Sequence, residues 1–571
     1  MNITELHSQF KLPIFYNKSK EQLAPNIITD LELICTNNTT EDPIYKHTFS
    51  PKTPLGENML KMFTEYYTDD IRFLKDTQKM LLNYSKNIKN DNISHHHYHT
   101  IITAWNEIKN ETGFCEKYFY IDWDFGKFLN TNPTFLQAMT VYNITSPILS
   151  LLLPVFILII PFFIIKLKGL NITMNQYLEI LKTIAVNHAI GKIFTKFNDV
   201  DVSQKIYIVV SAAFYVFSIY QNILICIRFY SNTKKIHDYL ITFKNYITET
   251  IQKMDDYLNI TQHLKTYEKF NAEVIKNKNI LLEYKTKLDI ISPFKLSVLK
   301  ILNMGHILKC FYELYDNKEY NDCLLYSFGF NGYIDNISGL CANISNKNIN
   351  KATFNKKGTI TFKKAFYPNL MNNSPVKNSY KLNKNIIITG PNASGKTTLL
   401  KTTLINVILS QQIGFGCYKE AKIVPFKFIH CYLNIPDTSA RDSLFQAEAR
   451  RCKEIIDCIN ENINKKHFCV FDELYSGTNP EEATISAQAF MEYISKYKNV
   501  SFLLTTHYIE LCKNLSSNNK IQNYNMKTIK LDKTFEYTYE LIEGISEIKG
   551  GLKVLYDMNY PTEILNKTEN V

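Results

Sequence analysis

Apolar and polar positions follow a helical period over much of the chain, but only after its first 45 residues. Residues 1–45 lack a clear period and are predicted to form an extended arm or a loose cap. From about residue 55 to 125, apolar residues recur at intervals of three and four, which predicts a helical region over 46–145. The period returns within 228–350, most clearly from Ile236 to Leu258. That segment is interpreted either as a helical arm that crosses a domain or meets a partner, or as an ordinary core-packed helix.

Two uncharged stretches lie within residues 146–227. No Asp, Glu, Lys or Arg occurs between Lys127 and Lys166, and residues 148–165 are almost wholly apolar. Their length reaches the lower limit for crossing the hydrocarbon core of a bilayer, about 17 to 25 residues. The second stretch, 206–227, is less apolar and includes Ser, Ala, Gln and Asn. We therefore predict a transmembrane helical hairpin, and the alternative is a buried helical pair in a soluble core.

Strand patterns replace the helical period after residue 351. Short runs rich in Ile, Thr and Phe occur at 359–362, 385–389, 468–471 and 501–505. Helical patterns separate the later runs, which is typical of a parallel sheet in an α/β domain. We therefore place a domain boundary near 340–355 and predict an α/β domain over 351–571.

A phosphate-binding sequence follows the strand at 385–389. It matches G-x-x-x-x-G-K-[ST] and extends one residue further: Gly390, Pro391, Asn392, Ala393, Ser394, Gly395, Lys396, Thr397 and Thr398. In such a loop, backbone N–H groups and the start of the next helix surround the phosphates of a nucleotide. Lys396 is predicted to contact the β and γ phosphates and Thr397 to coordinate Mg²⁺, so the sequence predicts a P-loop domain that binds ATP with magnesium.

Two further strand ends carry candidate catalytic residues. The run 468–471 ends in Asp472 and Glu473, where Asp472 is predicted to hold Mg²⁺ and Glu473 to act as the general base. The run 501–505 leads to Thr506 and His507, and His507 is predicted to contact the γ phosphate. Because ligands bind at the carboxyl ends of parallel strands, all three strand ends are expected at one site. An apolar strand ending in Asp-Glu, followed by a strand-end His, resembles the layout of ABC-type ATPases, which work as dimers.

Length, net charge and cysteine spacing limit the possible classes of protein but do not identify one. The chain has 571 residues, enough for about three to five domains, and 45% of them are hydrophobic. A formal net charge of +11 permits anionic partners, although no Arg/Lys stripe is visible. The 12 cysteines form no C-x-x-C pair, and the N-terminus lacks a secretory signal, so an intracellular protein with reduced thiols is expected. The run His95–His99 is typical of a solvated helix or loop more often than of a metal site.

Several motifs together resemble the MutS family of DNA mismatch-repair and recombination ATPases. Residues 389–398 resemble the family's TGPN-x-x-GKST, 471–478 resemble DE-x-x-x-GT, and 504–508 resemble its A-THY strand end. Residues 539–565 are similar to its C-terminal segment, with a turn at Gly544-Ile545-Ser546 and a proline-led helix at Pro561.

The resemblance implies further roles between these motifs. Residues 442–448, DSLFQAE, are similar to the family signature S-T-F-x-x-E, which implies that Ser443 acts in trans on the nucleotide of a partner subunit. The family usually has a Gly shortly before this Ser, whereas here Ala440, Arg441 and Asp442 precede it. Tyr367 stands where the family often has a His near the adenine, and a tyrosine ring can stack there equally well.

The N-terminal half does not share this resemblance. The tripeptides Phe63-Thr64-Glu65 and Phe114-Cys115-Glu116 have the letters of the family's mismatch wedge, but a chain with 36 Phe contains such runs by chance. A membrane hairpin is also foreign to soluble mismatch-repair proteins.

The sequence thus predicts a C-terminal α/β P-loop ATPase domain of the ABC type, preceded by a helical body similar to a lever or clamp with a membrane hairpin. The expected function is ATP hydrolysis that drives a homodimeric clamp on mismatched or branched DNA. The alternative is an ATPase clamp anchored in the membrane through 148–165 and 206–227, with its ATPase domain in the cytosol, that acts on a protein or on the membrane.

Overall fold

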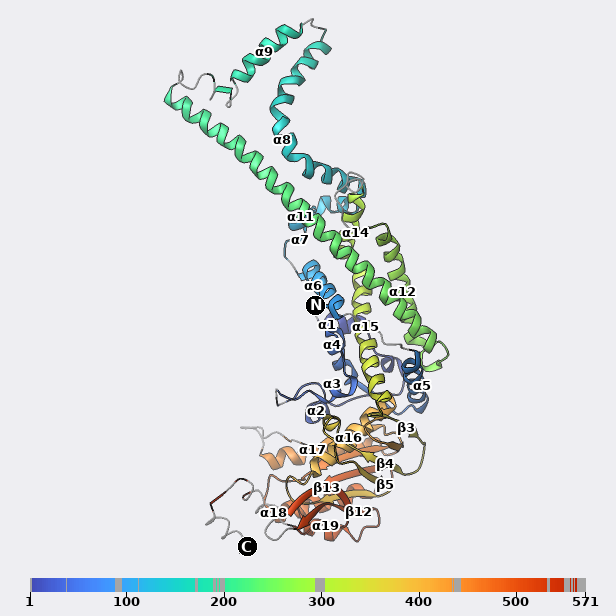
Figure 1. Ribbon diagram of the computed structural model, residues 1–571. Helices are drawn as coiled ribbons and strands as arrows, with labels where there is room; N and C mark the ends of the chain where they lie inside the picture. The colour runs from blue at the N-terminus through green and yellow to red at the C-terminus, as the bar shows by residue number, and fades with distance from the viewer. Residues whose placement is uncertain are drawn as a thin grey trace. The chain divides into compact units, whose positions relative to one another are not determined.

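The computed structural model describes most of the chain (Figure 1). The chain forms two compact units. The described residues are 3–36, 38, 40–87, 95–110, 112–169, 173–187, 191–192, 195, 201–292, 303–433, 435, 443–530, 535–548, 555, 558 and 560–561. One unit, here called the helical unit, comprises His99–Ile251 and Asn279–Cys323. The other, here called the α/β unit, comprises Asn2–Tyr98, Gln252–Lys278 and Leu324–Val571. The predicted helical body and C-terminal α/β domain are therefore confirmed.

Long and short helices contribute to the helical unit. They are α6 (His95–Asn110), α7 (Phe114–Tyr118), η2 (Asp124–Thr131), α8 (Pro133–Leu167), α9 (Met174–Asn187), α11 (Val202–Thr261), α12 (Glu268–Asp289), α14 (Met304–Asp316) and the start of α15 (Lys318–Ser345). Helix α14 packs closely on α8, because a Cβ atom at Gly305 would lie 2.0 Å from the carbonyl oxygen of Pro133. The backbone N–H of Gly305 donates to the Gln137 side chain at 2.9 Å.

Glu107 of α6 holds three helices of this unit together. Its carboxylate accepts hydrogen bonds from Lys117 (3.0 Å) and Tyr118 (2.5 Å) of α7, and from Lys235 (2.5 Å) and Tyr239 of α11. Burial by itself raises the pKa of Glu107, but these donors outweigh it and lower the pKa to about 2. The carboxylate therefore stays ionised and fixes α7 and α11 against α6.

Helices α8 and α11 contain the two uncharged stretches and contact each other. Tyr215 Oη donates to the Ser150 carbonyl oxygen (3.3 Å), Asn222 Nδ2 donates to Ser150 Oγ (2.6 Å), and Cys226 Sγ lies 3.7 Å from the Ile144 carbonyl oxygen. Pro133–Leu152 of α8 and the helix α11 are each long and apolar enough to span a membrane by length and composition. Little of either apolar window is buried, unlike the core helix of a soluble protein.

One helix covers two segments that the sequence pattern separates. The uncharged stretch 206–227 and the amphipathic segment after 232 both belong to α11, which continues through Arg228 without a break. Helix α8 likewise continues through Pro154 and Pro161. The change in side-chain polarity at residue 228 therefore does not mark the end of a helix.

The N-terminal segment differs from the predicted arm because it packs into the α/β unit. It contains α1 (Ile3–Gln9), η1 (Pro13–Tyr16), β1 (Lys20–Gln22) and α2 (Pro25–Asp30), and Leu6, Phe10 and Leu31 are fully buried. Next come α3 (Ile44–Phe49), α4 (Pro54–Phe63), β2 (Tyr66–Thr68) and α5 (Ile71–Asn87). The elements within residues 3–30 are too short for a period to show in the sequence.

Neither wedge-like tripeptide presents its phenylalanine to solvent. Phe63 is buried with its ring 4.2 Å from that of Phe49, and Phe114 is buried and stacked 4.1 Å from Tyr315. Both rings therefore serve the packing of their units.

Two mixed sheets form the C-terminal part of the α/β unit. The six-stranded sheet has the order β13-β12-β6-β11-β10-β9, in which only β13 is antiparallel. Its strands are β6 (Asn385–Thr389), β9 (Phe428–Tyr432), β10 (His467–Asp472), β11 (Val500–Thr505), β12 (Ile521–Lys530) and β13 (Phe535–Glu543). The predicted strands at 385–389, 468–471 and 501–505 correspond to β6, β10 and β11.

The second sheet has five strands in the order β5-β4-β8-β3-β7. They are β3 (Asn350–Phe354), β4 (Ile360–Ala365), β5 (Asn378–Leu382), β7 (Phe415–Gly416) and β8 (Glu420–Ile423), and η5 (Pro368–Leu370) follows β4. The helices of this region are α16 (Lys396–Ile413), α17 (Leu444–Glu461), α18 (Pro480–Ser495) and α19 (Ile509–Leu515). Apolar residues of α17, α18 and α19 pack on one face of the six-stranded sheet around Cys469, Phe471 and Phe502.

Candidate nucleotide-binding site

The loop between β6 and α16 has the backbone form that its sequence requires. All five residues of β6 are buried in the middle of the six-stranded sheet, so the strand end is held firmly. Gly395 precedes the helix with a φ of +94°, which glycine adopts readily and other residues rarely do. A Cβ atom at this position would lie 3.1 Å from the Tyr539 ring. The loop therefore turns sharply and directs the start of α16 into the space above the strand ends.

Lys396 lies inside this loop. Its side chain is buried, and Nζ donates hydrogen bonds to the carbonyl oxygens of Gly390 (2.9 Å) and Pro391 (3.2 Å). Burial lowers the pKa of Lys396, while the neighbouring carboxylates of Glu473 and Asp472 oppose that change. The ammonium group is thus held between the loop and the two acidic residues.

Thr397 and Asp472 meet although they are far apart in the sequence. Thr397 Oγ1 lies 3.0 and 3.2 Å from the two carboxylate oxygens of Asp472, and Thr505 Oγ1 also donates to this carboxylate. Burial raises the pKa of Asp472, and the hydrogen bonds from Thr505 and Thr397 oppose that change. A hydroxyl and a carboxylate at one point are oxygen ligands of the kind that Mg²⁺ prefers.

Glu473 follows Asp472 and turns toward His507 of the neighbouring strand end. Its backbone has a φ of +51°, and its N–H donates to the Thr505 carbonyl oxygen at 3.0 Å. The carboxylate lies 3.5 Å from His507 Nδ1. The hydrogen bond from His507 is the main reason that the pKa of Glu473 is lowered, so this carboxylate is ionised at neutral pH.

These residues surround a cavity of about 660 Å³. The loop residues Asn392–Thr398, Asp472 and Glu473 line one side, and Phe366, Tyr367, Leu370 and Val376 add an apolar and aromatic part. His507 lies beside Glu473 but is not part of the lining. Tyr367 belongs to this apolar part, and burial raises its pKa, so the phenol stays neutral.

Several lining residues have no counterpart among the sequence-based candidates. Met526 of β12, Tyr539 of β13 and Asn378 of β5 all face the cavity. The Asn378 side chain donates to the Tyr539 carbonyl oxygen (2.9 Å) and accepts from the Leu541 N–H (2.9 Å), which joins the two sheets. Nothing in the local sequence marks these residues, because their role depends on strand pairing between distant segments.

Ser443 does not reach the cavity of its own chain. It is the N-cap of α17, where its side chain accepts from the Gln446 N–H and the Gln446 side chain accepts from the Ser443 N–H. Residues 436–442, including Arg441, lie outside the described part of the chain.

Glu448 has a structural role that its place in the signature does not reveal. Its carboxylate is buried and accepts hydrogen bonds from Ser476 N (3.1 Å), Ser476 Oγ (3.0 Å) and Gly477 N (3.2 Å). The signature helix is thereby tied to the loop that follows Glu473.

The predicted Gly544-Ile545-Ser546 turn follows β13 directly. Gly544 has a φ of +113°, and its N–H donates to the Asn523 carbonyl oxygen at 3.0 Å. The Ser546 N–H donates to Thr389 Oγ1 at 2.8 Å, next to the start of the phosphate-binding sequence. Pro561 is described, but most of its neighbours are not, so the predicted helix there lies outside the described residues.

The fold and this site define an α/β domain of mixed sheets with a polar cavity at the carboxyl ends of its central parallel strands, where ligands bind in such sheets. Residues 386–571 match the family model of MutS domain V. The resemblance to the MutS family, and with it a MutS-type ATPase domain, is therefore confirmed for the C-terminal part of the chain.

Curated relatives agree with this match. Endonuclease MutS2 of Staphylococcus saprophyticus is 25% identical over 260 residues, which cover 44% of this chain and 32% of the relative. Endonuclease MutS2 of Caldicellulosiruptor saccharolyticus is 32% identical over 203 residues, 35% of this chain and 25% of the relative. The DNA mismatch repair protein MutS of Persephonella marina is 28% identical over 229 residues, 39% of this chain and 26% of the relative. The chain thus covers a third or less of the length of these relatives.

Proposed function

We propose that the chain binds ATP with Mg²⁺ in this cavity and hydrolyses it to ADP and phosphate. The observation that carries the proposal is the meeting of Lys396, Thr397, Asp472 and Glu473 in one cavity, although they come from different strand ends. This is the residue set expected of a P-loop domain.

The donor set fits a triphosphate and its magnesium ion. Ser394 Oγ is buried and has no hydrogen-bond partner among the residues that the structure describes, which suits a hydroxyl that contacts a phosphate oxygen. Thr397 and Asp472 would hold Mg²⁺, which neutralises phosphate charge when bound. Lys396 would exchange its loop carbonyl partners for phosphate oxygens, and Tyr367 would stack on the adenine.

Glu473 is the proposed general base of hydrolysis. Its lowered pKa keeps it ionised, so it accepts a proton from water as the water oxygen attacks the γ phosphorus and ADP leaves. His507 holds the Glu473 carboxylate at 3.5 Å and thereby orients it toward the phosphate.

We further propose that two such domains close over ATP as a homodimer and drive a clamp on mismatched or branched DNA. Ser443 supports this arrangement, because it lies at the start of a helix and outside the cavity of its own chain. The names of the relatives, a mismatch repair protein and endonucleases, support DNA as the partner. An intracellular location follows from this function.

The function is tested with the purified full-length protein and variants at two residues. Lys396→Ala is expected to abolish ATP turnover, and Glu473→Gln to bind ATP while hydrolysing it at least about a hundredfold more slowly. Wild-type turnover in either variant would refute the assigned role. For DNA, salt-sensitive binding to branched or mismatched duplex that changes with ATP is expected, and equal binding with and without ATP would refute the clamp.

A membrane-anchored clamp is the second candidate function, because apolar side chains of α8 and α11 are exposed. They include Ile148, Leu151, Phe163 and Ile164 of α8, and Ile206, Val209, Phe214, Val216, Phe217 and Ile227 of α11. Water-exposed apolar surface of this extent is unfavourable, at roughly 25 cal/mol per Å², whereas lipid removes the penalty. The bonds of Ser150 to Tyr215 and Asn222 are the polar interhelical contacts that membrane helices use.

Carbonate extraction of membranes from expressing cells distinguishes a chain that is inserted in the membrane from one that is not. If the chain is inserted, the wild type should stay in the membrane pellet. The double variant Phe214→Lys/Val216→Lys, which places two charges on the apolar stretch of α11, should be released. Complete release of the wild-type chain would refute insertion. ATPase stimulation by lipid vesicles without any response to DNA would favour the second candidate over the first.

A further inference from the structure

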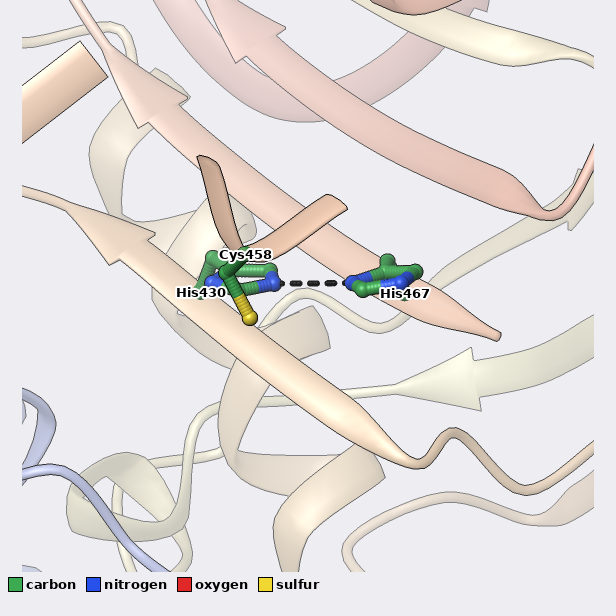
Figure 2. Close-up of side chains that lie close together, drawn as sticks. All are labelled: His430, Cys458 and His467. Atoms are coloured by element: carbon green, nitrogen blue, oxygen red, sulfur yellow. Dashed lines mark hydrogen bonds between the residues drawn. The ribbon is translucent and has the colours of Figure 1, made fainter. Parts of the chain in front are cut away.

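A second cluster of chemically active side chains lies at the opposite end of β10 from Asp472. His467 starts β10, His430 lies on the neighbouring strand β9, and Cys458 comes from the last turns of α17 (Figure 2). The ligand atoms of the three side chains all lie within 4.8 Å of one another. His467 is fully buried, and the other two are half-buried.

The two imidazoles face each other directly. His430 Nε2 and His467 Nδ1 are 3.1 Å apart, and the rings are nearly parallel, with an interplanar angle of 10°. His467 Nε2 lies 3.1 Å from the Asn462 carbonyl oxygen, which only accepts hydrogen bonds. His467 must therefore carry its proton on Nε2, which leaves the Nδ1 lone pair directed at His430. A backbone carbonyl that orients a histidine in this way is a common partner of metal-ligating imidazoles.

We propose that His430, His467 and Cys458 form a zinc-binding site, with the fourth position taken by water. Zinc binds imidazole nitrogen at about 2.0–2.1 Å and thiolate at about 2.3 Å in tetrahedral geometry. Two nitrogens that share such an ion lie about 3.3–3.4 Å apart, only slightly more than the 3.1 Å between His430 and His467. The sulfur of a zinc-bound Cys458 would lie about 3.6 Å from each nitrogen. The three ligand atoms already lie within 4.8 Å of one another, so a small adjustment of the side chains is enough to reach this distance.

The protonation states of the three groups suit this binding. Burial, followed by the neighbouring His467, lowers the pKa of His430 to about 3, and burial lowers the pKa of His467, so both rings are neutral at pH 7. Burial raises the pKa of Cys458, followed by the effect of Glu461, so the thiol is protonated before the metal binds. Binding transfers the His430 proton from Nε2 to Nδ1 and releases the Cys458 proton to solvent as the Zn–S bond forms.

The site would join α17, β9 and β10, and β10 ends at the nucleotide cavity. Cys458 lies near the end of the helix that Ser443 begins, and His467 lies on the strand that Asp472 ends. A zinc ion would fix the far end of α17 against β9 and β10. We expect it to stabilise the α/β unit.

Cobalt binding to the full-length protein tests the proposal, because Co²⁺ replaces zinc and a thiolate ligand adds a charge-transfer band in the near ultraviolet. One equivalent of Co²⁺ is expected to give this band, and Zn²⁺ to remove it by competition. Cys458→Ser should abolish the band and weaken zinc binding about tenfold or more. Cys35→Ser is the matched control, because Cys35 is an exposed cysteine outside the cluster, and it should behave like the wild type.

The other outcomes overturn the proposal. No band in the wild-type protein would mean that the two histidines form a hydrogen-bonded pair only. A band of equal intensity in Cys458→Ser would assign the thiolate elsewhere. Cobalt binding without a thiolate band would point to the histidine run at 95–99. Zinc should also raise the melting temperature of the wild type and of Cys35→Ser but not of Cys458→Ser, and an equal rise in all three would exclude this site.

Discussion

Truncation of Glu448 should loosen the contact between the signature helix and the loop after Glu473. Glu448→Ala removes a buried acceptor that serves Ser476 N, Ser476 Oγ and Gly477 N at 3.0–3.2 Å. Two of these donors are backbone N–H groups, which no rotation of a side chain can redirect. The loop around Ser476 and Gly477 then loses the group that holds it against α17.

The expected cost follows from the number and type of these bonds. A hydrogen bond to a charged group contributes about 1.5–3 kcal/mol, but bonds to one carboxylate are not additive. Removing the carboxylate also relieves the cost of burying it, and water reaches part of the emptied space. We therefore expect a loss of about 2–4 kcal/mol in the free energy of local opening, which is about 30-fold to 1000-fold in the opening equilibrium.

Hydrogen exchange followed by mass spectrometry measures this opening in peptides that cover 444–461 and 473–479. Glu448→Gln should lose less protection than Glu448→Ala, because it keeps one acceptor oxygen. The control is Glu454→Ala on the same helix, which removes an exposed ion pair with Arg451 (2.9 Å) and should cost about 1 kcal/mol or less. Equal exchange in Glu448→Ala and Glu454→Ala would refute the reasoning and leave the packing of Gly477 against Leu444 as the main restraint.

Three further predictions concern the magnesium ligands, the action of Ser443 in trans, and the pH dependence of stability. Thr397→Ala removes one of two oxygen ligands, so the Mg²⁺ concentration for half-maximal ATPase activity should rise about tenfold or more, and an unchanged requirement would contradict the metal assignment. Neither Ser443→Ala nor Lys396→Ala should be active alone, but mixing them should restore part of the ATPase activity if Ser443 acts in trans, because one composite site is then intact. His430 has a folded-state pKa of about 3 and an unfolded value near 6.5, so the unfolded chain binds more protons between these values. With a chelator present, stability should thus fall as the pH drops from 6.5 toward 3, and less steeply in His430→Gln; equal slopes in denaturant titrations would count against this cause.

Local patterns predicted the part of the site that a continuous segment forms. The apolar run at 385–389 and the glycines that follow it dictate a buried strand, a sharp turn and a helix start, and β6, Gly395 and α16 show these features. Asp472, Glu473 and His507 were also predictable, because each follows an apolar strand and parallel strands end at one edge.

Patterns of polarity did not predict the structure of segments that are buried without showing a regular period. Residues 1–45 have no visible period, yet Leu6, Phe10 and Leu31 are buried, because the short elements α1 and α2 pack on residues far along the chain. The polarity of the sequence changes at Arg228, whereas the backbone of α11 continues. Hydrogen bonding within a helix is independent of whether its side chains face lipid, water or protein.

The sequence alone determined the sharp turn and helix start after β6, the acidic strand end at Asp472 and the uncharged lengths of α8 and α11, since each depends on residues that are close in the chain. Only the tertiary structure decided that Tyr539 and Met526 line the cavity and that Glu448 holds the loop at Ser476. It also brought His430, Cys458 and His467 together. These contacts join residues whose separation in the sequence says nothing of their separation in space, because strand pairing and helix packing set that distance.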